Sequence, residues 1–158
     1  MRHPSVQVVI VMQRRRIENR WQSEKWEVDR VAPDAPADSE PAGLLYQDSI
    51  REQWLHRGFE MSLHRDEAEG YFLNLSSEQP FVFVMWREED GTAVPRAVTA
   101  SYNEAARLLD AGENVDGVPM PEEWVRWLAA FVAEHYKPES GKKRIRPPSF
   151  KGAWRDER

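Results

Sequence analysis

The sequence YFLNLSSEQPFVFVMWRE, residues 71–88, decides the fold that we expect for this chain. Residues 71–75 alternate between two faces, which is typical of a strand with one buried side. The polar connection at residues 76–80 is short enough to join adjacent antiparallel strands. Residues 81–86 are apolar throughout, which favours a central strand covered on both faces. The middle of the chain is therefore predicted to be a packed β-sheet.

Other short segments extend this sheet in both directions along the chain. Apolar runs or alternation predict further strands at residues 6–13, 26–31, 44–47, 53–64 and 97–100. Gly58 favours a bulge within the fourth of these segments, and Asp90-Gly91 favours a turn. The proline-rich residues 32–43 predict a loop, and residues 66–69 predict a single helical turn.

The periodicity changes to that of helices after the last predicted strand. Ser101 and Glu104 have the spacing of a capping box, so a helix is predicted at residues 102–111. Pro121 suits the first turn of a second helix, which is predicted at residues 122–136. Strands first and helices last indicate an α+β protein.

The expected architecture is an α+β domain in which residues 6–100 form a mostly antiparallel β-sheet or a partly open barrel. Two C-terminal α-helices pack on this sheet. A length of 158 residues suggests one domain, which we place at residues 1–137. Residues 138–158 are predicted to be a basic, disordered tail, because their composition does not support a core.

The sequence offers no chemistry for catalysis. It contains no cysteine, which excludes disulfides, thiolate–metal sites and cysteine nucleophiles. No phosphate-binding loop, nucleophile elbow or dinucleotide fingerprint occurs. His64 with Asp66 and Glu67 offers donors for a metal or acid–base site, but a solvated acidic turn explains this group better. We therefore expect no catalytic residue, no metal, no cofactor and no enzymatic activity.

The apolar run at residues 6–12 is the one candidate for a targeting or membrane-spanning segment. It is too short for a signal peptide and far too short to span a bilayer. A buried strand explains it, so a cytoplasmic location without membrane insertion is expected.

The net charge of −5 conceals two regions of opposite sign. Residues 137–158 carry eight Lys or Arg against three acids, a net +5, which leaves −10 for residues 1–136. The tail residues predicted to bind a partner are Lys142, Lys143, Arg144 and Arg146. A contact with an acidic protein, weak nucleic-acid binding and simple solubility all suit such a tail.

Tryptophan is abundant at seven residues, and three of them are candidates for binding a partner. Trp21 and Trp26, together with Arg20, have the composition of an aromatic and cationic interface. The alternative is that Trp26 lies in the core and Trp21 marks the entrance of a strand. Trp127 lies at the border of the buried stripe of the last predicted helix, so it belongs either to the core or to an interface.

Several segments of the chain resemble the DUF3305 family of bacterial proteins. They lie in the same order and at comparable spacing, and they are VVIVMQRRR (8–16), RWQSEKWEVDRV (20–31), LHRDEAEGYFLNLSSEQPFVFVMWR (63–87), VTASYNEAARLLDAGENVDGVPMPEEW (98–124) and AFVAEHYKPE (130–139) with a later KKR. Residues 44–49 depart from the family pattern, in which a Trp-rich strand is expected. The resemblance supplies no catalytic residues.

This resemblance implies a role beside formate dehydrogenase, because the family is encoded near genes for molybdenum- or tungsten-containing formate dehydrogenases. The expected function is that of a non-enzymatic accessory or assembly protein, which binds a subunit or maturation factor of that system. Two alternatives stay open. One is a module that binds a small molecule or a molybdopterin-type cofactor of the same pathway, and the other is a weak nucleic-acid binder that acts through the tail.

Overall fold

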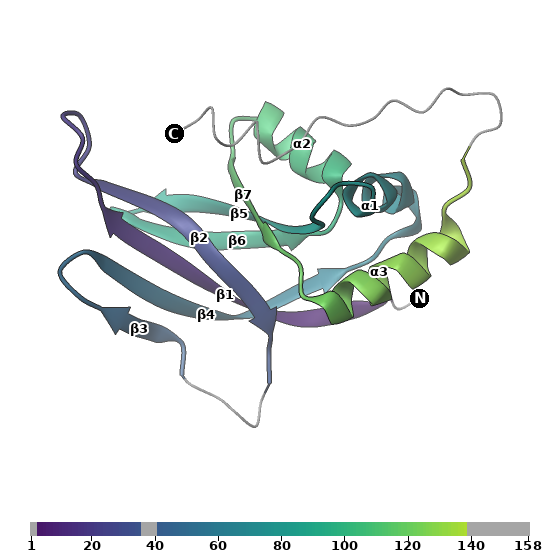
Figure 1. Cartoon of the computed structure of the whole chain (residues 1–158), viewed down its shortest axis with the longest axis horizontal. Helices are drawn as coiled ribbons and strands as arrows, with labels where there is room; N and C mark the ends of the chain where they lie inside the picture. Colours follow the sequence, from purple (N-terminus) through teal and green to yellow (C-terminus); the bar gives the residue numbers. More distant parts are fainter. Residues whose placement is uncertain (1–2, 36–40, 139–158) are drawn as a thin grey trace.

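The strands form two separate antiparallel sheets in the computed structural model, which describes residues 3–35 and 41–138 (Figure 1). The first sheet has the order β2-β1-β4-β3, with β1 at Ser5–Arg16, β2 at Glu24–Pro33, β3 at Gly43–Gln47 and β4 at Arg51–Ser62. The second has the order β6-β5-β7, with β5 at Phe81–Glu89, β6 at Thr92–Thr99 and β7 at Asn114–Pro119. The prediction of an α+β fold is confirmed. The prediction of one sheet over residues 6–100 is wrong, and the described strands form no closed barrel.

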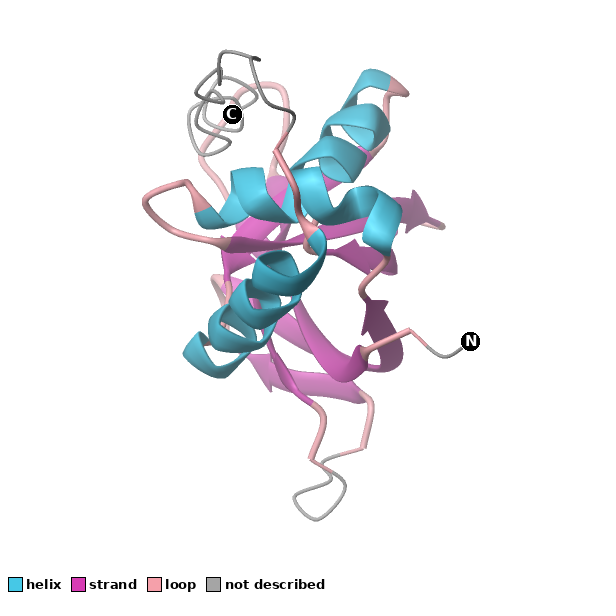
Figure 2. Ribbon diagram, turned by 90° about the vertical axis from the view of Figure 1, so that its right-hand side faces the viewer, coloured by secondary structure: helices cyan, strands magenta, loops and turns pink. Residues whose placement is uncertain are grey.

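Three α-helices cover the sheets in the described part of the chain. They are α1 at Ala68–Leu75, preceded by the 3-10 turn η2 at Arg65–Glu67, α2 at Tyr102–Asp110 and α3 at Glu122–His135. Helices α1 and α3 contact each other at one end of the sheets, and Figure 2 looks onto that end. The expectation of two C-terminal helices is imprecise, because α1 lies in mid-chain and β7 separates α2 from α3. Among the described helices, none has both the length and the apolar character to cross a membrane.

The strand at the centre of the second sheet has a hydrophobic core on each face. Val82 and Val84 of β5 pack into the main core, which also receives the inward side chains of β1 and of helices α1 and α3. Phe83 points the other way and packs with Ala105 of α2 and Val115 of β7. The prediction of a central strand covered on both sides is therefore confirmed.

Three local devices that the sequence predicted are present. Asp90 and Gly91 have φ values of 55° and 80°, as in a two-residue hairpin turn between β5 and β6. Gly58 has φ +87° and lies at a register shift between β1 and β4, which is the expected bulge. The Ser101 hydroxyl accepts a hydrogen bond from the Glu104 N–H (3.1 Å) and begins α2. The Ser101 N–H donates to Thr99 Oγ1 (3.0 Å), so the serine half of the capping box is the part that is confirmed.

The largest correction concerns residues 71–75, which belong to helix α1 rather than to a strand. Tyr71 and Asn74 are both buried, and residues three positions apart share one face of a helix. Phe72 makes this helical spacing hard to see in the sequence, because it is also apolar. Its ring stacks on the ring of Tyr136, with centroids 4.5 Å apart. The polar connection that follows therefore joins a helix to β5.

Candidate functional site

An open cleft of about 1020 Å³ lies between the edge of the first sheet and the edge of the second. Its walls include β2, the last strand of the first sheet on this side, and β7, the last strand of the second sheet. The connection between β1 and β2 supplies further lining residues, among them Trp21. The cleft thus occupies the place where the two sheets would have to pair to continue as one.

The β1–β2 connection holds Trp21 away from the core. The Ile17 N–H donates to the Ser23 carbonyl (3.0 Å) at the base of the connection, and the Trp21 N–H donates to Asn19 Oδ1 (2.9 Å) near its tip. The Trp21 side chain is 86% exposed, more than any other large apolar side chain in the described residues. Since it contributes little to the core, it is available to a partner.

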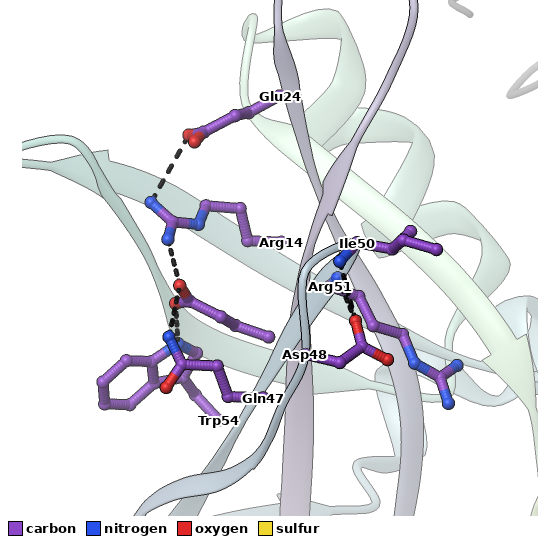
Figure 3. Close-up of polar contacts among 8 residues, drawn as sticks. Arg14, Glu24, Gln47, Asp48, Ile50, Arg51 and Trp54 are labelled. Carbon is purple, nitrogen blue, oxygen red and sulfur yellow. Dashed lines mark hydrogen bonds and ion pairs between the residues drawn. The ribbon is translucent and has the colours of Figure 1, made fainter.

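A polar network fixes the base of this hairpin against the neighbouring strand (Figure 3). Arg14 of β1 forms ion pairs with Glu24 of β2 (3.4 Å) and with Glu52 of β4. Its guanidinium also lies 5.8 Å from the centre of the Trp26 ring, within the range of a cation–π contact. The Trp54 indole N–H donates to Glu52 (3.2 Å). These contacts join three strands directly below the hairpin, so Trp26 is held in place at the cleft.

A second turn at the same end of the first sheet carries another exposed apolar residue. Asp48 Oδ1 accepts hydrogen bonds from the N–H groups of Ile50 (2.8 Å) and Arg51 (2.9 Å), which shapes the β3–β4 turn (Figure 3). The Ile50 carbonyl accepts the Arg16 N–H (2.7 Å), which ties this turn to the end of β1. Ile50 is 61% exposed. Trp21 and Ile50 are therefore presented from two turns that are connected through β1.

Asp116 of β7 bridges the two sheets inside the cleft. Its Oδ2 accepts a hydrogen bond from the backbone N–H of Val28 in β2 (2.8 Å). Burial raises the pKa of Asp116 above its ordinary value, because the charged form loses hydration. The Val28 N–H and the nearby Trp86 indole N–H oppose this rise in pKa, although the Trp86 contact does not meet the geometry of a hydrogen bond.

The lining of the cleft is acidic. Its five carboxylates are Glu24, Glu27, Asp29, Glu88 and Asp116, and its two cations are Arg15 and Lys25. Three of the carboxylates are paired with arginine: Glu24 with Arg14 (3.4 Å), Glu27 with Arg15 (3.3 Å) and Asp29 with Arg30 (2.5 Å). The negative charge left for a ligand therefore lies mainly on Glu88 and Asp116. A cleft lined with one predominant sign of charge concentrates the electrostatic field. The lining therefore favours a cationic ligand over an anionic one.

The structure brings together some of the residues that were predicted to bind a partner. Trp21 and Trp26 both line the cleft, and Arg20 is exposed beside Trp21. Trp127 instead packs half-buried against the main core and is not part of the cleft lining. The basic residues Lys142, Lys143, Arg144 and Arg146 lie outside the described residues.

Trp86 and Asp116 are among the cleft residues that the sequence did not reveal. Trp86 was assigned to a buried central strand, and it does pack against the main core, but it also lines the cleft. Asp116 lies in β7, for which the sequence shows no alternating pattern. Both residues belong to the cleft because they lie across from β2, and only the tertiary structure shows this.

The histidines at positions 56, 64 and 135 pack against other rings or are partly buried. Within residues 3–35 and 41–138, no group of three or more His, Cys, Asp or Glu side chains is arranged to hold a metal ion. The His64 ring contacts the ring of His3 (4.2 Å between centroids), and His135 contacts Phe131 (4.4 Å). Burial lowers the pKa of His56, because the charged imidazolium would lose hydration.

The fold and the cleft together define an α+β protein with two antiparallel sheets and an acidic, tryptophan-rimmed cleft between their edges. The chain belongs to the DUF3305 family: the family model, described as a protein of unknown function, matches residues 7–146. The family resemblance seen in the sequence is thereby confirmed. No curated protein and no solved structure matches the chain.

Asp116→Asn is expected to stabilise the protein more at about pH 7 than at about pH 3.5. Because burial raises the Asp116 pKa, the folded protein binds this proton more tightly than the unfolded chain does. The contribution of Asp116 to stability therefore falls as the pH rises from its ordinary pKa of 3.8 through the raised pKa. Asparagine keeps an oxygen for the Val28 N–H and carries no charge. Urea unfolding of both proteins at the two pH values measures the difference.

The control for this prediction is Glu134→Gln on α3, where the side chain is 75% exposed. This change removes a carboxylate that is hydrated in both states, so it should alter stability little at either pH. A stabilisation by Asp116→Asn that is equal at both pH values, or larger in acid, would contradict the raised pKa.

Proposed function

We propose that this chain is a non-enzymatic accessory protein that docks on a protein partner through the hairpin end of its first sheet. The observation that carries the proposal is the 86% exposure of Trp21 on a hairpin that is braced at its base. Burying a rigid indole removes a large apolar area from water at little cost in side-chain entropy. The exposed Ile50 on the neighbouring turn would extend the same contact.

The proposed partner is a component of a molybdenum- or tungsten-dependent formate dehydrogenase system, either a subunit or a maturation factor. This assignment rests on the family resemblance and on the gene neighbourhood that the resemblance implies. We propose a cytoplasmic location for the protein as well. The tail residues Lys142, Lys143, Arg144 and Arg146 are proposed to assist the encounter.

The charge of the cleft argues against the two alternatives, which are a module that binds a small molecule or molybdopterin-type cofactor and a nucleic-acid binder. A volume of about 1020 Å³ would admit a small molecule, and tryptophan faces would stack on a pterin. Glu88 and Asp116, the lining carboxylates that are not paired with an arginine in the ion pairs above, would repel the phosphate of a molybdopterin-type cofactor and the phosphates of nucleic acid. A nucleic-acid contact would therefore be confined to the tail.

Affinity purification of the tagged full chain from its native host tests the proposal, with mass spectrometry of the proteins that come with it. A formate dehydrogenase subunit or maturation factor is the expected partner. Recovery of the chain without any such component would overturn the assignment. Absorbance at wavelengths above the tryptophan band in the purified protein would support the cofactor alternative instead, and salt-dependent retention on heparin would support the nucleic-acid alternative.

Trp21→Ala is expected to speed dissociation of the partner complex about 30-fold, which corresponds to about 2 kcal/mol for an interfacial hot spot. The reason is that this side chain makes its apolar contact only in the complex. Surface-binding kinetics with the purified partner measure the rate. Arg126→Ala at an exposed position of α3, outside the proposed contact, is the control, and it should leave the dissociation rate unchanged.

The tail is expected to act on the association rate instead. Replacing Lys142, Lys143, Arg144 and Arg146 together by serine should slow association at low salt and have little effect at about 0.5 M salt, because surface charges are then screened. If this variant changes dissociation alone while Trp21→Ala changes nothing, then the proposed roles of hairpin and tail are wrong.

A further inference from the structure

We infer that the cleft between β2 and β7 binds an extended, basic segment of the protein partner, which adds as a strand along the free edge of β2. This inference rests on the proposed function, since it names the chemistry of the segment that the partner supplies. Three features of the cleft support it: the direction of the backbone groups of β2, the charge of the lining and the aromatic rings that line it.

The free edge of β2 presents backbone donors and acceptors to the cleft. The Val28 N–H points away from β1, because it donates to Asp116 across the cleft (2.8 Å). Ile17 and Ser23 form a hydrogen-bonded pair at the other end of the hairpin (3.0 Å), and the register between these points is continuous. Since backbone groups alternate along an antiparallel strand, the N–H and C=O groups of Trp26 and Glu24 point the same way as those of Val28.

An edge of this kind is suited to strand addition. An extended peptide forms main-chain hydrogen bonds with the outward groups, and its alternate side chains face the neighbouring surface. Residues 24–28 offer an edge for about five or six peptide residues. β2 is the outer strand of the first sheet, and Asp116 accepts a hydrogen bond from its edge at Val28.

The charge of the cleft selects basic side chains. Basic side chains of an added strand would lie beside the second sheet, which supplies Glu88 and Asp116 to the lining. Burial already raises the free energy of the charged Asp116 carboxylate, and a guanidinium or ammonium group would offset that cost. The other three lining carboxylates are paired with arginines of the chain itself, so Glu88 and Asp116 are the ones that favour a basic side chain.

The aromatic rings add a second preference for cations. Trp26 already has the Arg14 guanidinium 5.8 Å from its ring centre, so the protein itself places a cation on this ring. Trp21 and Trp86 also line the cleft. Tryptophan is the best aromatic partner for a cation, and arginine is the cation that most often stacks on it. The segment should therefore be richer in arginine than in lysine.

Titration of the full chain with acetyl-Arg-Thr-Arg-Thr-Arg-Thr-amide tests this inference by calorimetry and by amide NMR shifts. The peptide is expected to bind at least tenfold more tightly than the same peptide with glutamate in place of arginine, and to shift the amides of residues 24–28. The double variant Asp116→Asn with Glu88→Gln should weaken binding at least tenfold, whereas Glu134→Gln on α3 should not change it. The inference would be overturned if the protein bound the arginine and glutamate peptides equally well. It would also be overturned if the double variant bound the arginine peptide as tightly as Glu134→Gln does.

N-methylation of the probe separates strand addition from simple charge attraction. Two peptides carry N-methyl groups on alternate backbone nitrogens, one on the arginines and one on the threonines. Because only every second N–H of an added strand faces β2, one of the two peptides should lose at least tenfold in affinity and the other should keep it. If both bind like the parent peptide, no strand is added and the inference fails.

The chain's own basic tail is the competing occupant. If replacing Lys142, Lys143, Arg144 and Arg146 by serine raises the affinity for the probe tenfold or more, the tail fills the cleft and the assignment to a partner segment is wrong. An unchanged affinity supports the partner segment. These titrations need no native partner, so a failed affinity purification together with a positive titration would remove the proposed function and leave the cleft chemistry standing.

Discussion

Replacing Phe83 by alanine is expected to lower the free energy of unfolding by about 3–5 kcal/mol. Phe83 is 1% exposed and lies on the face of β5 that α2 covers. It packs with the buried Ala105 and Val115 and lies edge-on to the Phe81 ring (6.2 Å between centroids). Its removal leaves a cavity between the second sheet and α2, within a cluster that also includes Tyr102, Leu108 and Leu109. Urea unfolding of the full chain measures the loss.

Trp21→Ala is the matched control for this substitution, because it also removes an aromatic side chain. Trp21 is 86% exposed, so its loss should change the free energy of unfolding by no more than about 0.5 kcal/mol. A cost for Phe83→Ala below about 1 kcal/mol would mean that the second core is not packed as described. An equal cost for both substitutions would mean that Trp21 is not free of the core.

The burial of Phe83 was open to prediction because its signals are local. Six consecutive apolar residues at 81–86 leave no polar face for solvent, so both faces of the strand must be covered. The turn at Asp90-Gly91 and the cap at Ser101 are local for the same reason, since each depends on a few neighbouring residues. Features of this kind were predicted correctly.

The sequence predicted where most strands lie better than it predicted which strands pair with each other. β1, β2, β4 and β5 each carry an apolar run or an alternating pattern, but nothing in such a pattern says which strand lies next to which. The third strand of the second sheet is β7, which pairs with β5 from Phe81 opposite Pro119 to Trp86 opposite Asn114. Its sequence NVDGVP has too few apolar residues to show a period of two. The pairing with β5 is what makes it a strand.

The cleft could be predicted only in part for the same reason. Trp21 was recognised as a candidate because tryptophan beside arginine in a polar stretch is unusual for a core. Asp116 and Trp86 come from the second sheet, and they reach β2 through contacts between residues about 60 to 90 positions apart, such as the hydrogen bond from Val28 to Asp116. A sequence pattern describes the local neighbours of a residue, whereas this cleft is formed by residues that are far apart in the sequence.

The helix–strand error at residues 71–75 has a physical counterpart at Asn74. As a strand residue it would have faced solvent, but in α1 it is 2% exposed. Its Nδ2 donates to the carbonyls of Phe81 (2.8 Å) and Ala100 (2.9 Å), and its Oδ1 accepts the Phe81 N–H (2.9 Å). One amide thus joins α1 to the beginning of β5 and to the residue that follows β6. A polar side chain in an apolar segment was the signal that this position has a special role.

Asn74→Ala is expected to lower the free energy of unfolding by about 3–5 kcal/mol, because three backbone groups lose their partner at a buried position and each such loss costs about 1–3 kcal/mol. Asn103→Ala is the matched control: the Asn103 amide donates to Glu69 (3.3 Å) in an exposed contact, so water replaces the lost bond. Its substitution should cost no more than about 0.5 kcal/mol. Urea unfolding of both variants compares the two amides directly. An equal loss of unfolding free energy in the two variants would contradict the buried network. A loss near zero for Asn74→Ala would mean that Asn74 faces solvent, as it would in the strand that the sequence predicted.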